Sequence, residues 1–188
     1  MPTDILHTLR TRSHEHARAR REVIALSNEA LSKSKRAIFA YQREDAKAAR
    51  TLLKEAAALF AKAEKGMGRD GSLRYEGAYR AALEEYAEAL LFGQYLKNGK
   101  MGAIDARAMD PQVYLAGLCD ATGEIVRHIV RQVTLGNTKP VRAARDTAEG
   151  VVEFMLELDA TGNLRAKFDQ AKGNLKRLEE ILYDLSLR

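Results

Sequence analysis

The stretch that decides the fold is LEEYAEALLFGQYL, residues 83–96. It contains no proline and no glycine before Gly93, so it predicts a helix. At 3.6 residues per turn, Glu85 and Glu88 are neighbours on one side of that helix. The same side also carries the apolar residues Ala89, Phe92, Tyr95 and Leu96. Because unpaired buried charge is costly, these two acids predict an ion-pairing partner, a proton or a bound cation.

The composition around this stretch favours one helical domain. The chain has 188 residues, of which 46% are hydrophobic, which suits a single domain over residues 1–188 with a sizeable core. Its single cysteine excludes an intrachain disulfide and fits a reducing cytoplasm. No apolar run approaches the roughly 20 residues of a membrane span, and the N-terminus lacks the apolar segment of a secretory signal. We expect a cytoplasmic protein without a membrane anchor.

Turn and capping signals divide the rest of the chain into helices. Asp45 and the pair Asp110-Pro111 favour helix starts, while Gly66 and Gly99 favour helix ends. Residues 1–13 are expected to be a loose or frayed start, and residues 101–109 a connection. No strand pattern or internal repeat is present. The sequence therefore predicts an all-α, single-domain bundle of six or seven helices, at about 14–42, 46–65, 72–97, 111–135, 139–158 and 164–187.

A second acid pair lies in PQVYLAGLCDATGEIVRHIVRQV, residues 111–133. Asp120 and Glu124 are like-charged neighbours four residues apart, which costs a few tenths of a kcal/mol on an isolated helix. Arg127 and His128 follow Glu124 by three and four residues and can offset that cost. An exposed helix with ion pairs is one interpretation, and a functional acid pair is the other.

Two glycines and a cysteine in the same helix carry further predictions. Gly117 and Gly123 lower helix propensity, so close packing or close ligand approach is a reasonable cause. Cys119 has no catalytic partner in the sequence and is expected to be a small buried hydrophobe.

If the two helices pack face to face, their four acids form one all-oxygen site. Such ligands select hard cations, Mg²⁺ or Mn²⁺, which can activate water and stabilise charge on a phosphodiester oxygen. A ferritin-like di-iron centre needs Glu-x-x-His on two helices, and no histidine here follows a glutamate at that spacing. A zinc site lacks clustered Cys and His ligands, and no nucleophile-elbow motif is present.

The whole chain has a net charge of +5, and many of its basic residues lie in the N-terminal part. In isolation such a run is more often a solvated helix face. The sharper hypothesis is a ridge that contacts phosphates, where each Lys or Arg releases a counterion.

Four segments together resemble the translin superfamily: SKSKRAIF (32–39), LEEYAEALLF (83–92), YLAGLCDATGEIVR (114–127) and RLEEILYDLSLR (177–188). The resemblance covers nearly the whole chain in order. It implies a seven-helix bundle that assembles into a hollow oligomer, an octamer, and binds single-stranded nucleic acid, especially RNA.

The superfamily has a binding arm, translin itself, and a catalytic arm, translin-associated factor X. The acids of the catalytic arm fall on Glu85, Glu88, Asp120 and Glu124 of this chain. This match implies a Mg²⁺-dependent endoribonuclease with these four residues as metal ligands and catalytic groups. The short connection after residue 98 suggests a compact, microbial or archaeal, homo-oligomeric member.

Basic residues are assigned to RNA by position alone. The nucleic-acid-binding set is Arg20, Arg21, Lys35, Arg36, Arg74, Arg80 and Arg127, of which Arg127 lies nearest the acids in sequence. Two alternatives stay open at this point: a non-catalytic oligomer that binds single-stranded RNA or DNA, and a scaffold that only pairs with another subunit. The need for a second translin-type subunit is also left open.

Overall fold

The computed structural model describes residues 3–68, 71–104 and 109–187, and these residues form helices and connections without a β-strand. The prediction of an all-α fold is confirmed. The elements are α1 (Thr3–Gln42), α2 (Ala46–Gly66), the short 3₁₀ helix η1 (Ser72–Tyr75), α3 (Gly77–Asn98), α4 (Pro111–Thr134), α5 (Val141–Leu156) and α6 (Gly162–Ser186).

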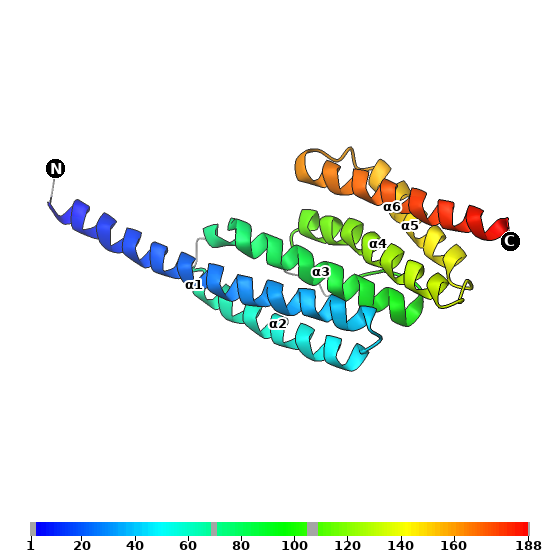
Figure 1. Cartoon of the computed structure of the whole chain (residues 1–188). Helices are drawn as coiled ribbons and strands as arrows, with labels where there is room; N and C mark the ends of the chain where they lie inside the picture. Colours follow the sequence, from blue (N-terminus) through cyan, green and yellow to red (C-terminus); the bar gives the residue numbers. More distant parts are fainter. Residues whose placement is uncertain (1–2, 69–70, 105–108, 188) are drawn as a thin grey trace.

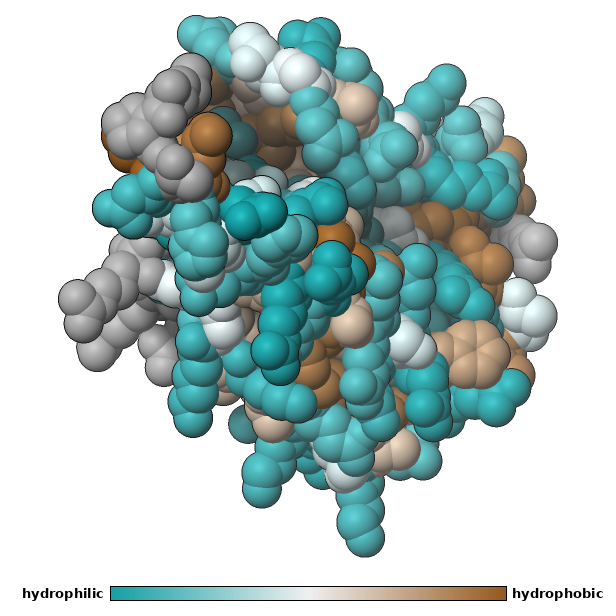
Figure 2. Space-filling view, turned by 90° about the vertical axis from the view of Figure 1, so that its left-hand side faces the viewer, coloured by the Kyte–Doolittle hydropathy of each residue, from teal (hydrophilic) through white to brown (hydrophobic). Residues whose placement is uncertain are grey.

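Helices α3 and α4 occupy the middle of the bundle (Figure 1). The α1–α2 hairpin packs on the α3 side, and the α5–α6 hairpin packs on the α4 side. The first turns of α1 extend past the other helices as an arm. From the end that carries this arm, hydrophilic side chains cover most of the surface, with smaller hydrophobic areas between them (Figure 2). A central pair of helices is thus held from both sides.

The core consists of three connected groups of buried side chains. The central group draws on all six α-helices and includes Ile38, Phe92, Ile125 and Leu178. A second group lies between α1, α2 and α3, and a third between α3, α4, α5 and α6. Burial of these side chains fixes the spacing of α3 and α4 because each large buried side chain contributes about 1.5–3 kcal/mol.

Several predicted helix boundaries are confirmed by their capping geometry. The Asp45 carboxylate accepts a hydrogen bond from the Ala48 N–H at 2.9 Å at the start of α2. Asp110 likewise accepts from the Gln112 N–H at 2.8 Å at the start of α4. Gly99 ends α3 with a φ of 69°, a conformation that glycine adopts without a steric penalty.

Other boundaries differ from the prediction. Helix α1 begins at Thr3 instead of near residue 14, because residues 3–13 contain no Gly or Pro that would stop it. Gly66 lies inside α2, and the positive φ of this turn falls on Gly68. The expected third helix is divided into η1 and α3. Residues 69–70 and 105–108 of the predicted loops lie outside the described ranges. Among the described helices, none combines the length and apolarity needed to cross a membrane.

Candidate metal centre and nucleic-acid interface

The contact between α3 and α4 is built around Gly117. A Cβ atom at this position would lie 2.7 Å from Ala87 Cβ and 2.9 Å from the Glu84 carbonyl oxygen and the Glu88 amide nitrogen. Only a glycine allows the two backbones to approach this closely. The predicted close packing is confirmed at Gly117, whereas at Gly123 the nearest atom would be 3.4 Å away, an easier fit.

This contact brings the four predicted carboxylates into one region. The pKa of Glu88 is raised from its ordinary value of 4.5 to about 8, first by burial and then by the negative charges of Glu85, Asp120 and Glu124. Such mutual effects require carboxylates from both helices to be near one another. Carboxylates of both helices therefore lie near one another across the α3–α4 interface, and the charges of the other three acids all act on Glu88.

On the side facing α1, the acids have polar and basic neighbours. Glu85 has a raised pKa because it is partly buried, and Lys35 opposes this effect from 4.0 Å between Nζ and Oε2. Gln42 donates a hydrogen bond from Nε2 to Glu124 Oε2 at 2.7 Å. The Arg127 guanidinium lies 3.7 Å from the same carboxylate oxygen. This side is therefore screened by cations that remain partly exposed.

On the side facing α6, a lysine forms an internal ion pair with the cluster. Lys167 Nζ contacts the Asp120 carboxylate. Burial lowers the pKa of Lys167, but the hydrogen bond to Asp120 and the charges of Asp120, Glu84 and Glu88 outweigh burial and raise it. Burial raises the pKa of Glu84, and Asp120 adds to that effect. One ammonium group thus balances part of the negative charge.

Sequence reasoning missed Glu84, Lys167 and Gln42. Glu84 precedes Glu88 by four residues, so its helical spacing was a usable signal. Lys167 lies 47 residues from Asp120 and Gln42 lies 82 residues from Glu124. No local pattern in the sequence links residues so far apart, and only the packing of α1 and α6 brings them to the acids.

The donor atoms fit a hard divalent cation in chemistry and charge, because all are carboxylate oxygens in a partly buried site. The ligand shell is not closed in this conformation. Within residues 3–68, 71–104 and 109–187, no three His, Cys, Asp or Glu side chains form a group that could hold a metal ion. Asp120 is engaged by Lys167, and Glu124 is engaged by Gln42. The metal and catalytic roles of the four acids stay predictions.

The predicted basic residues do not form one ridge. Lys35 and Arg127 border the carboxylates, as described above. Arg20 instead pairs with Glu76 at 2.6 Å, near η1. Arg80 pairs with Asp110 at 2.7 Å, at the start of α4.

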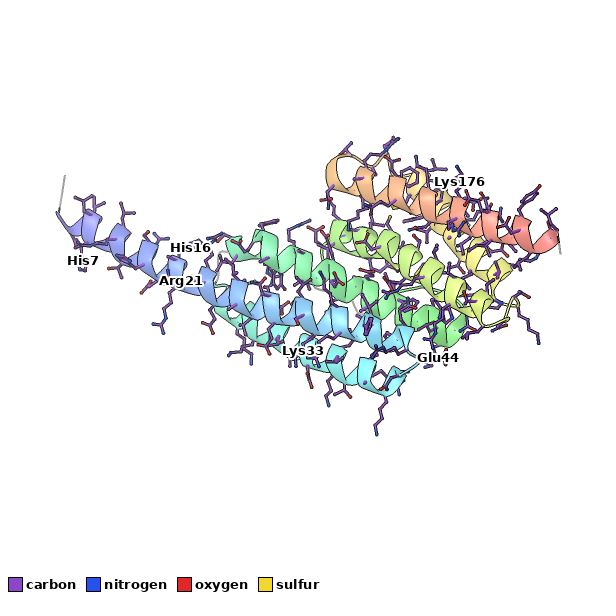
Figure 3. The ribbon with its side chains drawn as sticks, in the orientation of Figure 1. His7, His16, Arg21, Lys33, Glu44 and Lys176 are labelled. Atoms are coloured by element: carbon purple, nitrogen blue, oxygen red, sulfur yellow. The ribbon has the colours of Figure 1, made fainter. Side chains whose placement is uncertain are left out.

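The other three members of the basic set have exposed side chains: Arg21, Arg36 and Arg74. Figure 3 shows Arg21 where α1 leaves the bundle, with Glu44 in the turn that follows this helix. Arg74 and Arg80 line a cavity of about 330 Å³ at the start of α4. The seven basic residues therefore occupy at least two separate places.

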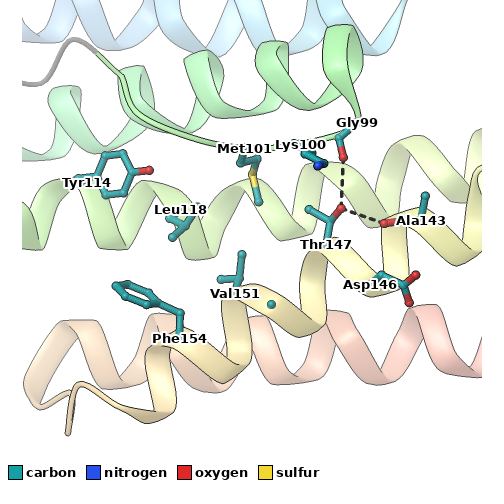
Figure 4. A pocket seen from close by; sticks show the side chains of 11 residues that line it. Gly99, Lys100, Met101, Tyr114, Leu118, Ala143, Asp146, Thr147, Val151 and Phe154 are labelled. Carbon is teal, nitrogen blue, oxygen red and sulfur yellow. Dashed lines mark hydrogen bonds between the residues drawn. The ribbon is translucent and has the colours of Figure 1, made fainter.

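A larger cavity, of about 640 Å³, lies between α4, α5 and the connection that follows α3 (Figure 4). Its lining is mainly apolar and includes Met101, Leu118 and Phe154. It contains none of the four predicted acids. Cys119 is 1% exposed, which confirms the prediction of a small buried hydrophobe, and burial raises the pKa of its thiol to about 12.

The chain is thus an all-α bundle whose two central helices bring carboxylates near one another. The Translin family model matches residues 7–188, and the chain belongs to this family. Translin of Gallus gallus is 33% identical over 81 residues, which is 43% of this chain and 35% of that protein. Translin of Homo sapiens is 32% identical over 81 residues, or 43% of this chain and 36% of that protein. The matched segment thus spans about a third of the length of these relatives.

Solved structures share the fold over nearly the whole chain. AfC3PO superposes with a TM-score of 0.86 at 24% identity, covering 96% of this chain and 97% of that one. Apo-NeC3PO gives a TM-score of 0.84 at 24% identity, covering 96% and 95%. AfC3PO has also been solved in a complex with duplex RNA, to which this chain is similar with a TM-score of 0.86 at 23% identity, covering 96% and 97%. Likeness at this level of identity shows a common fold.

Proposed function

We propose that this chain is the subunit of a hollow oligomer, an octamer, that cleaves single-stranded RNA with bound Mg²⁺ or Mn²⁺. In this proposal it belongs to the catalytic arm of the family. The observation that supports it best is the environment of Glu88, a partly buried carboxylate with three further acids close enough to raise its pKa. Removing like charges from water at one place is unfavourable for folding alone, so a functional reason is expected.

Glu85, Glu88, Asp120 and Glu124 would hold the ion. When bound, the ion would lower the pKa of a water molecule and stabilise negative charge on the scissile phosphate. A carboxylate oxygen outside the ligand shell would accept the proton of the attacking water. Lys35 and Arg127, at the edge of the cluster, would attract the phosphates and offset their repulsion by the acids.

A second function has its own support. The chain could be a non-catalytic oligomer that binds single-stranded RNA or DNA. The ion pair between Lys167 and Asp120 favours this alternative, because it neutralises part of the cluster without a metal ion. The curated relatives reported above are also named Translin, the name of the binding arm. In this case cleavage would require a second translin-type subunit.

The deciding experiment is a cleavage assay on the purified protein alone. Single-stranded RNA, duplex RNA and single-stranded DNA are incubated with Mg²⁺, with Mn²⁺ or with EDTA. The proposal predicts cleavage of single-stranded RNA that EDTA abolishes and that Asp120→Asn lowers at least about 100-fold. Binding without cleavage under every metal condition would favour the second function, and cleavage that persists in Asp120→Asn would refute the metal site.

A further inference from the structure

Phe39, on α1, is an exposed aromatic side chain between two arginines. Its residue surface is 46% exposed. The Arg43 guanidinium carbon lies 4.4 Å from the centre of the ring, and that of Arg127, on α4, lies 5.9 Å away. Both distances are within the range of cation–π attraction. One aromatic ring is therefore held in contact with two positive charges, one from the turn after α1 and one from α4.

This arrangement continues to the carboxylate cluster. Lys35 and Phe39 share one face of α1 and are about 6 Å apart along its axis. Arg43, in the turn that follows α1, lies four residues further on and continues this row, with its backbone N–H bonded to the Phe39 carbonyl at 3.2 Å. Lys35 lies 4.0 Å from Glu85, and Arg127 lies 3.7 Å from Glu124. A row of cation, ring and cation thus runs along the edge of the acids.

A second exposed phenylalanine provides a contrast. Phe154, on α5, is also 46% exposed, but it lines the large apolar cavity beside Leu118 and Val151. The cores of protein–protein interfaces are depleted of charged residues, and the surroundings of Phe154 fit this description better than those of Phe39. Surfaces that bind single-stranded nucleic acid combine an aromatic ring with surrounding cations. The surroundings of Phe39 match this second pattern.

We propose that Phe39 is a stacking platform for a nucleobase of a single-stranded nucleic acid, with Arg43 and Arg127 placed to contact the adjoining phosphates. A base can lie on an aromatic ring or on a guanidinium plane, and the pairing of Phe39 with Arg43 offers both. A strand held here would pass directly along the carboxylates. This inference rests on the nucleic-acid binding proposed above and names the side chain that orients the strand.

The absence of tryptophan from the sequence allows a direct spectroscopic test. Phe39→Trp introduces a single indole at the platform, and Phe154→Trp is the matched control with the same residue type and exposure. Each variant is titrated with oligouridylate of about ten nucleotides, with the matching oligodeoxythymidylate, and with an abasic sugar-phosphate oligomer of equal length. Binding of each labelled oligomer is followed independently by fluorescence anisotropy.

Stacking predicts that the emission of Phe39→Trp falls by about half when either base-containing oligomer binds and changes little with the abasic oligomer. Phe154→Trp should show no quenching with any of them. Phe39→Leu keeps an apolar side chain but cannot stack, and it should weaken oligouridylate binding about tenfold while leaving the abasic oligomer unaffected.

Three results would overturn the inference. If oligouridylate binds while the emission of Phe39→Trp is unchanged, the platform is wrong and the proposed nucleic-acid binding stands. If the emission of Phe39→Trp depends on protein concentration when no oligonucleotide is present, the ring faces a second copy of the chain. If the wild-type protein binds no oligomer at low salt, the proposed function fails together with the platform.

Discussion

Asp110 and Glu88 are two carboxylates of the same α3–α4 unit with opposite environments. Asp110 is the N-cap of α4. Its carboxylate accepts a hydrogen bond from a backbone N–H and forms an ion pair with Arg80. These contacts, led by the Arg80 hydrogen bond, lower its pKa. Glu88 lies among three other acids, and burial and repulsion raise its pKa to about 8.

The two environments show that Asp110 stabilises the fold, whereas the charged form of Glu88 destabilises it. Asp110 satisfies local rules, since it caps a helix and meets a cation. Glu88 lies where burial and like charges disfavour its ionised form, and such exceptions concentrate at functional sites. Removing the Asp110 carboxylate should lower the free energy of unfolding. Neutralising Glu88 should raise the free energy of unfolding and remove cleavage activity.

The largest expected effect comes from Glu88→Gln, which keeps the shape of the side chain but removes its charge. We expect metal-dependent RNA cleavage to fall at least about 100-fold, because a metal ligand is lost. The free energy of unfolding without metal above pH 8 should rise by roughly 1–3 kcal/mol, because the like-charge repulsion disappears. Single-turnover cleavage and urea denaturation measure the two quantities.

Asp110→Ala is the comparison variant. It should lower the free energy of unfolding by about 1 kcal/mol, the usual value of an N-cap, and keep cleavage within a few-fold of wild type. Equal losses of activity in the two variants would remove the distinction between the two acids.

The next effect concerns the backbone contact that holds the acids together. Gly117→Ala places a methyl group under 3 Å from three atoms of α3, so the helices must separate. We expect a loss of about 1–3 kcal/mol in the free energy of unfolding and a parallel loss of activity. Gly123→Ala in the same helix should be neutral or slightly stabilising, because its contact is looser and alanine favours helix. Thermal unfolding that ranks the two variants in the reverse order would contradict this account of the contact.

Stability should also depend on pH through Glu88. Since its pKa is raised from 4.5 to about 8, the folded state holds a proton across this range that the unfolded state releases. The folded protein is therefore favoured at low pH and loses stability as pH rises through this window. We expect a decrease of about 1–3 kcal/mol in the metal-free protein, measured by urea denaturation in steps between these limits. Glu88→Gln should flatten the profile, and an unchanged slope in that variant would assign the dependence to other groups.

The smallest effect is expected at Lys167, the ammonium group that the cluster already contains. Lys167→Gln removes a positive charge that competes with a divalent cation at Asp120. We expect the Mg²⁺ concentration for half-maximal cleavage to fall about threefold, a change of less than 1 kcal/mol. A rise in that concentration would instead make Lys167 a support for the metal site.

The fold was largely predictable because its signals are local. Asp45, Asp110 and Gly99 mark helix ends through capping groups within a few residues in the sequence. Gly117 was also a usable signal, since a glycine within a helix predicts close packing or close ligand approach, but Gly123 carried the same signal and packs more loosely. The start of α1 was missed because residues 3–13 carry no clear apolar stripe, although they also contain no Gly or Pro that would stop a helix.

The candidate site was predictable only in part. Glu85 and Glu88 were predicted as site residues because they are charged residues on an apolar helix side. Asp120 and Glu124 were predicted from their helical spacing. Lys167 and Gln42 act across tertiary contacts, which no periodicity encodes. Phe39 was visible in the sequence, but only the approach of Arg127 from α4 distinguishes it from an ordinary surface aromatic.

Equilibrium binding of Mn²⁺ to the purified protein tests the central claim most directly. Electron paramagnetic resonance of the free ion, recorded at pH 8, gives the bound fraction for the wild type, Glu88→Gln, Asp120→Asn and Asp110→Ala. The account predicts saturable binding to the wild type and Asp110→Ala, and a loss of at least about tenfold in affinity in the other two variants. Absence of binding to the wild type, or equal binding by all four proteins, would contradict it.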